Sequence, residues 1–350
     1  MNTLEELNPE AAPATPAIDS LQLDSETAER LIAGKARIVA ELGKVIVGQQ
    51  EIIDQLLIAL LAGCHCLITG APGLAKTLLV KSIARIFHLK FQRIQFTPDL
   101  MPADITGTEI LQDTGEGRRM VFAKGPVFAN IILADEINRT PPKTQAALLE
   151  AMQEHQVTAG GTRHLLEEPF FVLATQNPIE MEGTYPLPEA QLDRFMFNVV
   201  MDYLPEDDEV AVVTRTTSSA PAPIEALFTG EDVLRFHELV RKVPVAEEFV
   251  RYAVRLAAAS RPRQAGAPDF INEWAGWGAG TRAGQFLILG AKARALIKGR
   301  AHVNLDDIRT LAAPTLRHRI LLNYRAEAEG VGVEDVIKRL LSSVKPPNEP

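Results

Sequence analysis

Short apolar runs alternate with amphipathic stretches in the chain up to about residue 204. Runs with the length of buried strands occur at residues 66–69, 91–96, 130–134, 170–174 and 196–201. The stretches between them place apolar residues at helical spacing, as at Leu79, Ile83 and Ile86. Five buried strands alternating with helices predict an α/β fold with a parallel sheet, whose functional site lies at the carboxyl ends of the strands.

The same periodicities predict further elements. Helices are expected at residues 29–42, 52–61 and 142–155. Glycine turns inside extended stretches predict β-hairpins at 107–126 and 156–165. The later part of the chain is predicted to be helical, with helices at 207–216, 230–243, 246–259, 282–299 and 306–316. Asn304 is expected to cap the last of these, with Asp307 three residues on. The sequence therefore predicts a tail (1–25), an α/β domain (26–204) and a helical domain (205–345).

The loop after the first predicted strand is rich in glycine. Its sequence at residues 70–77 is GAPGLAKT, and a predicted helix follows. The amides of such a loop converge on one anion, and the helix N-terminus adds positive potential, so the loop is expected to wrap phosphates. Lys76 would then reach the β- and γ-phosphates of a nucleotide, and Thr77 would ligate Mg²⁺. Ala75 stands where the strict pattern has glycine, which is tolerated if its φ stays negative. The alternative is a plain Gly/Pro turn.

Polar residues follow two of the predicted strands where those strands end. Asp135 and Glu136 come after the run at 130–134, and Asn177 follows the run at 170–174. In a nucleotide site, Asp135 would hold Mg²⁺ through water, while Glu136 would orient and deprotonate the attacking water. If the two strands are neighbours, Asn177 would position that water or touch the γ-phosphate. The alternative for the two acids is a solvated helix cap, because a helix starts shortly after them.

Two other loops carry candidate contacts. Residues 45–50 (VIVGQQ) form a short apolar connection just before the phosphate loop, where Gly48 and its neighbour Gln49 would read the edge of an adenine ring. A simple turn between two helices explains this segment equally well. Residues 261–280 are rich in glycine and proline and contain Trp274 and Trp277. We expect these tryptophans to hold the helical domain against the sheet domain rather than to bind a partner.

Composition narrows the classes of protein. The chain has 350 residues, of which 46% are hydrophobic and 23% are charged, as in ordinary globular proteins. A net charge of −9 and a pI near 5.4 argue against nucleic-acid binding driven by global charge. No apolar run reaches the length of a membrane span. The first 25 residues are rich in Glu, Pro, Ala and Asp, which predicts a disordered acidic tail and not a signal peptide.

The two cysteines, Cys64 and Cys66, flank His65. This group offers too few ligands at the wrong spacing for a metal site. We also expect that cysteines at alternate positions do not both face one core. The sequence therefore predicts reduced thiols in a cytoplasmic protein.

Taken together, the site residues carry a family resemblance. The loop at 70–77, the acids Asp135 and Glu136, Asn177 and Arg194 resemble, in order and spacing, the two Walker motifs, sensor 1 and arginine finger of AAA+ ATPases. Longer phrases are similar to the MoxR family, namely FTPDLMP at 96–102, DEINR at 135–139 through LLEAM at 148–152, and ATQNP at 174–178 through EAQLDRF at 189–195. The match runs from about residue 33 to 319, and that family commonly carries alanine at the position of Ala75.

The resemblance implies an ATPase that uses ATP and Mg²⁺, with a helical lid that closes on the nucleotide. The implied metal ligands are Thr77 and Asp135, and the implied catalytic residues are Glu136, Asn177, Arg194 and Arg282. The implied nucleotide-binding residues are Gly48, Gln49, Gly70, Ala71, Pro72, Gly73, Leu74, Ala75, Lys76, Thr77 and Leu78.

Two arginines have alternatives. Arg194 is expected to act in trans on ATP bound to the neighbouring subunit, unless it only forms a salt bridge with Asp193 or Glu189. Arg282 falls at the sensor 2 position, although Thr281 stands where the family usually has proline. It is otherwise an ordinary arginine at a helix start.

Three functions compete at this stage. The resemblance implies a chaperone-like motor that forms a homo-oligomeric ring, expected to be a hexamer, and remodels a client protein. Its expected partner is a von Willebrand factor A domain protein, and its expected role includes metal-cofactor insertion. A motor subunit of the magnesium-chelatase kind shares the inserted hairpins. A nucleic-acid translocase is disfavoured by the charge and by the lack of an appended nucleic-acid module.

Overall fold

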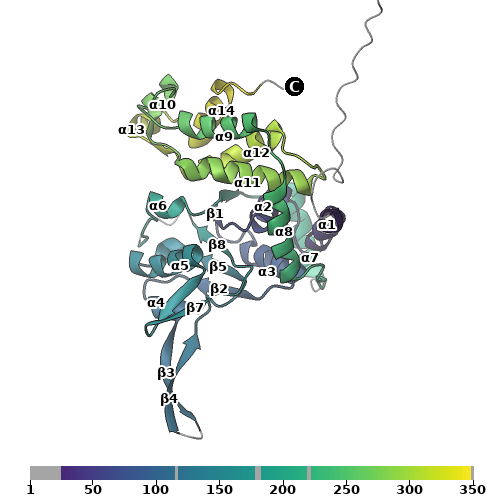
Figure 1. Ribbon diagram of the computed structural model, residues 1–350, viewed down its shortest axis with the longest axis vertical. Coiled ribbons are helices and arrows are strands. Elements are labelled where there is room, and N and C mark those ends of the chain that lie inside the picture. Colours follow the sequence, from purple (N-terminus) through teal and green to yellow (C-terminus); the bar gives the residue numbers. More distant parts are fainter. Residues whose placement is uncertain (1–24, 115–116, 178–182, 219–221, 348–350) are drawn as a thin grey trace, which may run out of the picture.

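A five-stranded parallel sheet lies at the centre of the α/β domain (Figure 1). The computed structural model describes residues 25–114, 117–177, 183–218 and 222–347. Its strands lie in the spatial order β2-β5-β8-β1-β9, where β1 is Cys66–Gly70, β2 is Phe91–Gln95, β5 is Ile131–Asp135, β8 is Phe171–Gln176 and β9 is Phe197–Met201. The predicted α/β fold is confirmed. Residues 1–24 of the predicted tail lie outside the described residues, and Ser25 is the first residue of a helix.

Alternate residues of the three central strands β5, β8 and β1 face two separate apolar cores. In β5, Ile131 and Leu133 belong to one core, whereas Ile132 and Ala134 belong to the other. The first core includes residues of α1 (Ser25–Gly43), α2 (Gln50–Leu61) and α3 (Lys76–Ile86). The second includes residues of α4 (Pro102–Thr106) and α5 (Pro142–Glu154). Because both faces are covered, the strands read as continuous apolar runs.

Cys64 and Cys66 both lie in the first core, so the expectation that they do not share one core is wrong. Positions two apart in an extended chain point to the same face. Both thiols are free and buried. Burial raises the pKa of the Cys64 thiol to about 12 and that of Cys66 well above its ordinary value, so both stay protonated.

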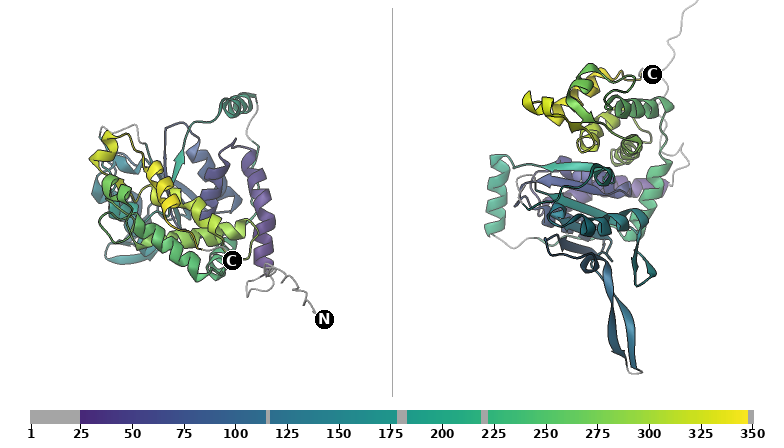
Figure 2. Two further views of the ribbon diagram at one scale, coloured as in Figure 1. Left: turned by 90° about the horizontal axis from the view of Figure 1, so that it is seen from above. Right: turned by 90° about the vertical axis from the view of Figure 1, so that its left-hand side faces the viewer.

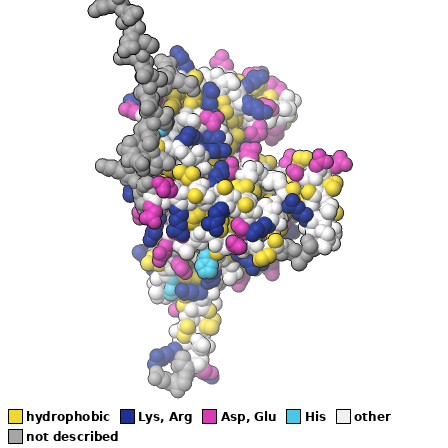
Figure 3. Space-filling model, turned by 90° about the vertical axis from the view of Figure 1, so that its right-hand side faces the viewer, with side chains coloured by type: hydrophobic (Ala, Val, Ile, Leu, Met, Phe, Trp, Pro, Cys, Tyr) yellow, Lys and Arg dark blue, Asp and Glu magenta, His cyan; other side chains and the backbone are white. Residues whose placement is uncertain are grey.

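Two β-hairpins interrupt the alternation of strands and helices, as predicted. One consists of β3 (Gly107–Thr114) and β4 (Gly117–Lys124), the other of β6 (Gln156–Ala159) and β7 (Thr162–Leu165). The β3–β4 hairpin extends from the α/β domain at the end opposite the helical domain (Figure 1), and residues 115–116 of its tip lie outside the described residues. Its cross-strand partners Leu111 and Met120 are both exposed, and hydrophobic side chains show along its stem (Figure 3).

The C-terminal part of the chain is helical, as predicted. It contains α7 (Glu206–Ser218), α8 (Gly230–Lys242), α9 (Glu247–Ala259), α10 (Asp269–Trp274), α11 (Thr281–Ile297), α12 (Leu305–Leu316), α13 (Tyr324–Ala328) and α14 (Val333–Ser343), with a short ribbon of β10 (Ala275–Trp277) and β11 (Leu321–Leu322). Asn304 Oδ1 accepts a hydrogen bond from the Asp307 amide at 3.0 Å, which confirms the predicted cap. None of the helices in the described ranges is long and apolar enough to cross a lipid bilayer.

The helical layer lies on one side of the α/β domain (Figure 2). Its central helix α11 packs on α9 and α12 within the layer and on α1 and α2 below it. Helix α8 also packs on α1 and α2, although it follows the predicted domain boundary at residue 204. Helix α7 has no buried side chain among its described residues and stands at the margin of the domain (Figure 2).

Trp274 does not hold the helical domain to the sheet domain, so that expectation is wrong for this residue. Its indole packs beside Phe270 and under the Arg339 guanidinium, and its Nε1 donates a hydrogen bond to Glu329 at 2.8 Å. These contacts all lie within the helical domain, whose own short helices supply the packing surface. Trp277 borders the junction with the α/β domain, but it is 64% exposed.

Candidate active site

The glycine loop joins β1 to α3, in the strand–loop–helix order that the sequence predicted. Gly70 allows β1 and β9 to approach closely, because a Cβ there would lie 2.4 Å from the Met201 carbonyl oxygen. Gly73 has a φ of +83°, a conformation that side chains rarely adopt. Glycine is therefore required at Gly70 by the close approach of β9 and at Gly73 by the positive φ.

Ala75 has a φ of +57°, so the condition of a negative φ, under which its methyl group would cause no strain, is not met. The residue precedes α3 directly, and the left-handed conformation there turns the backbone from the loop into the helix. Turns that place a left-handed residue among ordinary ones bring successive N–H groups together into an anion-binding concavity. Ala75 thus carries a strained backbone at the phosphate loop, as residues at functional sites often do.

The loop lines a cavity of about 470 Å³ together with residues from three strand ends. Its lining consists of Pro72, Gly73, Leu74, Ala75, Lys76, Thr77, Leu78, Arg93, Asp135, Glu136, Thr175 and Asn177. Lys76 Nζ donates a hydrogen bond to the Gly70 carbonyl. Partial burial lowers the pKa of Lys76, and the charges of Asp135 and Glu136 oppose that shift. The cavity therefore combines loop amides, an ammonium group and two carboxylates.

Asp135 is bound on both of its carboxylate oxygens. The Thr175 hydroxyl donates to Asp135 Oδ1 at 2.6 Å. Arg93 donates to Oδ2 through Nε at 2.9 Å and through Nη2 at 2.6 Å. Since β8 and β2 lie on either side of β5, the sheet order itself brings these two partners to Asp135.

Glu136 is held in a fixed orientation next to Asp135. Its φ of +57° is rare for a residue with a side chain, and its amide donates to the Thr175 hydroxyl at 2.8 Å. Its Oε2 accepts hydrogen bonds from Gln95 Nε2 at 3.0 Å and from Arg139 Nη1 at 3.2 Å. Thr175 therefore ties the two acids together, accepting from the backbone of one and donating to the side chain of the other.

Asn177 follows the end of β8, the strand next to β5, and it is buried and lines the same cavity. The structure thus brings Asn177, Asp135, Glu136 and the loop to one place. Thr77 and Asp135 supply oxygen atoms, the ligand type that Mg²⁺ takes, usually together with substrate phosphates. The described residues hold no cluster of three or more His, Cys, Asp or Glu side chains suited to a metal. A Mg²⁺ ion would be held here by Thr77 and Asp135 together with bound phosphates.

Gly48 and Gln49 do not line this cavity. Both have a positive φ, and a Cβ on Gly48 would meet the Asp208 carboxylate at 2.7 Å. Gln49 lines a second cavity of about 470 Å³ with residues that follow β9, among them Tyr203 and Leu204. The adenine contact at this loop stays a prediction.

Arg194 and Arg282 lie away from the phosphate loop. Arg194 precedes the amino end of β9, which lies beside the amino end of the parallel strand β1: the amide of Met196, the residue before β9, donates to the carbonyl oxygen of His65, the residue before β1. Lys76 instead follows the carboxyl end of β1. The backbones of Arg194 and Lys76 are therefore separated by the length of a five-residue strand, roughly 16 Å. Arg194 Nη1 donates to the Leu149 carbonyl at 2.5 Å, and Arg282 Nη1 lies 3.4 Å from Asp193 Oδ2.

Every residue described as lining the cavity comes from the α/β domain, so closure of the lid on the nucleotide stays a prediction. Helix α11 packs on α1 and α2, and Arg282 near its start lies 3.4 Å from Asp193, which precedes the amino end of β9. The sequence reading also missed Arg93, Gln95, Arg139 and Thr175 as site residues. Arg93 and Gln95 occupy alternate positions of a predicted strand, but only the sheet order shows that this strand borders the acids.

The chain matches two protein-family models and is similar to known proteins over most of its length. The model of the ATPase family associated with various cellular activities (AAA) matches residues 65–197, and an AAA lid domain matches residues 271–340. The chaperone MoxR1 of Mycobacterium tuberculosis is 44% identical over 313 residues, which are 89% of this chain and 82% of that protein. The uncharacterised protein YeaC of Bacillus subtilis is 40% identical over 317 residues, or 90% and 95% of the two chains.

Two further proteins are similar to this chain over most of their length. Protein MoxR of Methylorubrum extorquens is 28% identical over 335 residues, 89% of this chain and 95% of that protein. A Cytophaga hutchinsonii protein crystallised as a candidate ATPase has a TM-score of 0.86 and 43% identity, and the match covers 92% of this chain and 98% of that one.

Proposed function

Since this chain belongs to the MoxR family of AAA ATPases, we propose that it binds ATP with Mg²⁺, hydrolyses it and uses the turnover to remodel or mature a partner protein. One observation carries the proposal: the loop, Lys76, Asp135, Glu136 and Asn177 converge on a single cavity at the carboxyl edge of the sheet. That edge is where parallel α/β sheets bind their ligands.

Each residue has a role that its position supports. The loop amides and Lys76 bind the phosphates. Thr77 and Asp135 would hold a Mg²⁺ ion, which would neutralise charge on the phosphates. Glu136 orients the attacking water and accepts its proton, because its backbone and carboxylate are both held by hydrogen bonds. Asn177, next to Glu136 at the neighbouring strand end, positions the same water.

Arg194 and Arg282 are proposed to act on the ATP of the neighbouring subunit. Both lie near Asp193, roughly one strand length from the cavity of their own chain. A guanidinium is permanently charged and offers a rigid fork to the γ-phosphoryl oxygens. A contact in which the cavity face of one subunit meets the arginine face of the next is heterologous and closes into a ring, for which we propose six subunits.

The proposal that this protein acts on a partner protein rests on its membership of the MoxR family. A chaperone among the similar proteins favours remodelling of a protein or complex. A von Willebrand factor A domain protein is the proposed partner, metal-cofactor insertion is a proposed use of the motor, and the cytoplasm is the proposed location. A magnesium-chelatase-like motor is the alternative. A nucleic-acid translocase is disfavoured by the net charge of −9.

The test of the catalytic proposal is a mixing experiment. Arg194→Ala subunits keep Glu136 but lack the finger, whereas Glu136→Gln subunits keep the finger but lack the base. Each preparation should bind ATP and be inactive alone. Mixed rings should regain turnover, because about one quarter of randomly formed interfaces combine both intact groups. If native mass spectrometry shows mixed rings and no activity returns at any ratio, the trans role of Arg194 is wrong.

The partner is tested by trapping. Glu136→Gln subunits loaded with ATP should retain a partner protein in a pull-down, whereas Lys76→Ala subunits should not. Stimulation of the wild-type ATPase by single-stranded DNA, and not by a co-purified von Willebrand factor A domain protein, would favour the translocase instead.

A further inference from the structure

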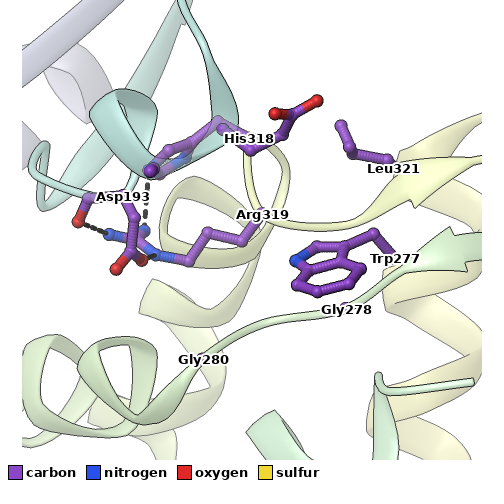
Figure 4. A pocket seen from close by; sticks show the side chains of 9 residues that line it. Asp193, Trp277, Gly278, Gly280, His318, Arg319 and Leu321 are labelled. Carbon is purple, nitrogen blue, oxygen red and sulfur yellow. Dashed lines mark hydrogen bonds and ion pairs between the residues drawn. The ribbon is translucent and has the colours of Figure 1, made fainter.

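A buried arginine bridges the lid and the α/β domain. The side chain of Arg319, in the turn after α12, is 2% exposed and points at Asp193 (Figure 4). Its Nε donates to Asp193 Oδ1 at 2.7 Å, and its Nη2 donates to the carbonyl oxygens of Asp193 at 2.9 Å and Phe195 at 2.7 Å. A single nitrogen thus binds the backbone on both sides of Arg194.

The remaining nitrogen of Arg319 strengthens the same junction. Its Nη1 donates to the Met196 carbonyl at 3.3 Å and to the Thr315 carbonyl in α12. His318, the preceding residue of the lid, places its Nε2 3.1 Å from the Phe195 carbonyl. The lid therefore forms hydrogen bonds with three backbone carbonyl groups, those of Asp193, Phe195 and Met196, and also with the Asp193 side chain.

Asp193 balances the charges around this segment. Burial lowers the pKa of Arg319 to about 10, while the hydrogen bond and the charge of Asp193 oppose the shift, so Arg319 stays protonated at neutral pH. The second oxygen of Asp193 lies 3.4 Å from Arg282. One carboxylate is therefore shared by two lid arginines beside Arg194. Removing it would leave a buried positive charge without its partner.

In the part of the chain that the structure describes, the side chain of Arg194 itself contacts the α/β domain and not the lid residues that hold its backbone. It bonds to the Leu149 carbonyl of α5, whereas the carbonyls on either side of it are held by the lid. The position from which the Arg194 side chain starts is thus determined by Arg319, although the two guanidinium groups have different partners.

We propose that Arg319 is a positioning residue for Arg194: it fixes residues 193–196 to the lid, so that the lid of one subunit sets where Arg194 meets the ATP of the next. This inference rests on the proposed trans role of Arg194. A misplacement of about 1 Å at a reacting centre can cost on the order of 100-fold in rate. Arg319 therefore affects hydrolysis at a neighbour's cavity while its own subunit's cavity stays intact.

The mixing design isolates this role. Arg319→Met rings should bind ATP as the wild type does and lose on the order of 100-fold in kcat. Mixed with Glu136→Gln subunits, they should regain turnover, because the latter supply correctly placed fingers to intact Glu136 sites. Mixed with Arg194→Ala subunits, they should stay inactive, because neither subunit supplies a finger. A lid arginine that matters only for folding would not produce this selective rescue.

Two further variants test whether the effect of Arg319→Met is specific to its contact with residues 193–196. Arg300→Met removes another lid arginine. Within the described part of the chain its ion pairs are with the fully buried Asp307 and not with residues 193–196, so its rings should keep their turnover. Asp193→Asn keeps the shape of the side chain but removes the charge that pairs with Arg319, so residues 193–196 should be held less firmly and the variant should behave as Arg319→Met does.

The outcomes are distinguishable. If Arg194→Ala with Glu136→Gln regains no activity, the proposed function of Arg194 fails. If that pair regains activity while Arg319→Met and Asp193→Asn do not, or do not assemble at all, Arg319 is only structural and this inference is wrong.

Discussion

Arg93 and Asp135 are bound to each other across the neighbouring strands β2 and β5, with two guanidinium nitrogens 2.6 and 2.9 Å from Asp135 Oδ2. Asp135 is also the proposed Mg²⁺ ligand. The same carboxylate therefore binds an arginine in this structure and would hold a metal ion when ATP is bound. Two cations that use one carboxylate compete for it.

Arg93→Ala should therefore lower the Mg²⁺ concentration that gives half-maximal ATPase activity. The guanidinium side chain is 47% exposed, and an exposed ion pair contributes at most about 1 kcal/mol, so we expect a change of up to about fivefold. A Mg²⁺ titration at saturating ATP measures it. Arg139→Ala, which removes an arginine bound to Glu136, is the control and should leave the midpoint unchanged. A higher Mg²⁺ requirement for Arg93→Ala would show that Arg93 assists the metal site.

Lys76→Ala should weaken ATP binding by on the order of 100-fold or more, since charge-assisted hydrogen bonds to phosphate contribute about 1.5–3 kcal/mol each. Isothermal titration calorimetry measures the affinity. Lys81→Ala, an exposed lysine further along α3, should bind ATP normally. Equal affinities for the two variants would contradict the assignment of the phosphate loop.

Ala75→Gly should raise the stability of the protein by up to about 1 kcal/mol, because a left-handed residue with a Cβ is strained and glycine is not. The increase in Tm should be about 2 °C. Ala71→Gly, in the same loop but without a positive φ, should lower the stability through the added freedom of the unfolded chain. Thermal denaturation without nucleotide compares the two variants, and the same sign for both would contradict the strain at Ala75.

Protonation of His65 should destabilise the protein below pH 6.5. Burial lowers the pKa of His65 to about 4, its Nδ1 accepts from the Val172 amide and its Nε2 donates to the Met152 carbonyl. The folded state therefore favours the neutral ring, whereas the unfolded chain takes up a proton near pH 6.5, so stability falls as the pH falls toward 4. Between pH 7.5 and 5 the loss from this residue should be about 2 kcal/mol.

Urea denaturation at several pH values measures this contribution. His65→Asn keeps one donor and one acceptor but does not titrate, so its stability should depend less on pH by that amount. Parallel curves for the two proteins would show that His65 is not the titrating group.

Leu111→Ser combined with Met120→Ser should leave basal ATPase activity and Tm nearly unchanged. The two side chains are 59% and 58% exposed and lie on a hairpin that points away from the sheet. A hairpin whose apolar side chains face solvent suits contact with a client or a neighbouring subunit. Joint loss of basal activity and folding would show instead that the hairpin is structural.

The sequence by itself determined the elements and the chemistry of the catalytic cavity. Apolar runs and glycine signals act over a few residues, so they located the strands, the loop at 70–77 and the acids Asp135 and Glu136. The capping pair of Asn304 and Asp307 is equally local. Parallel strands end at one edge, which is why Asn177 was expected near the acids before the strand order was known.

Only the tertiary structure decided what lies beside these residues. Arg93 and Gln95 reach the acids because β2 pairs with β5, and no local pattern encodes which strands pair. The φ of Ala75 depends on how the loop meets α3. The lid packs along the edge strand β9 and on α1 and α2, and this packing places Arg282 beside Asp193, before the amino end of β9. Arg319 contacts Asp193 from 126 positions away, and packing between domains alone creates that contact.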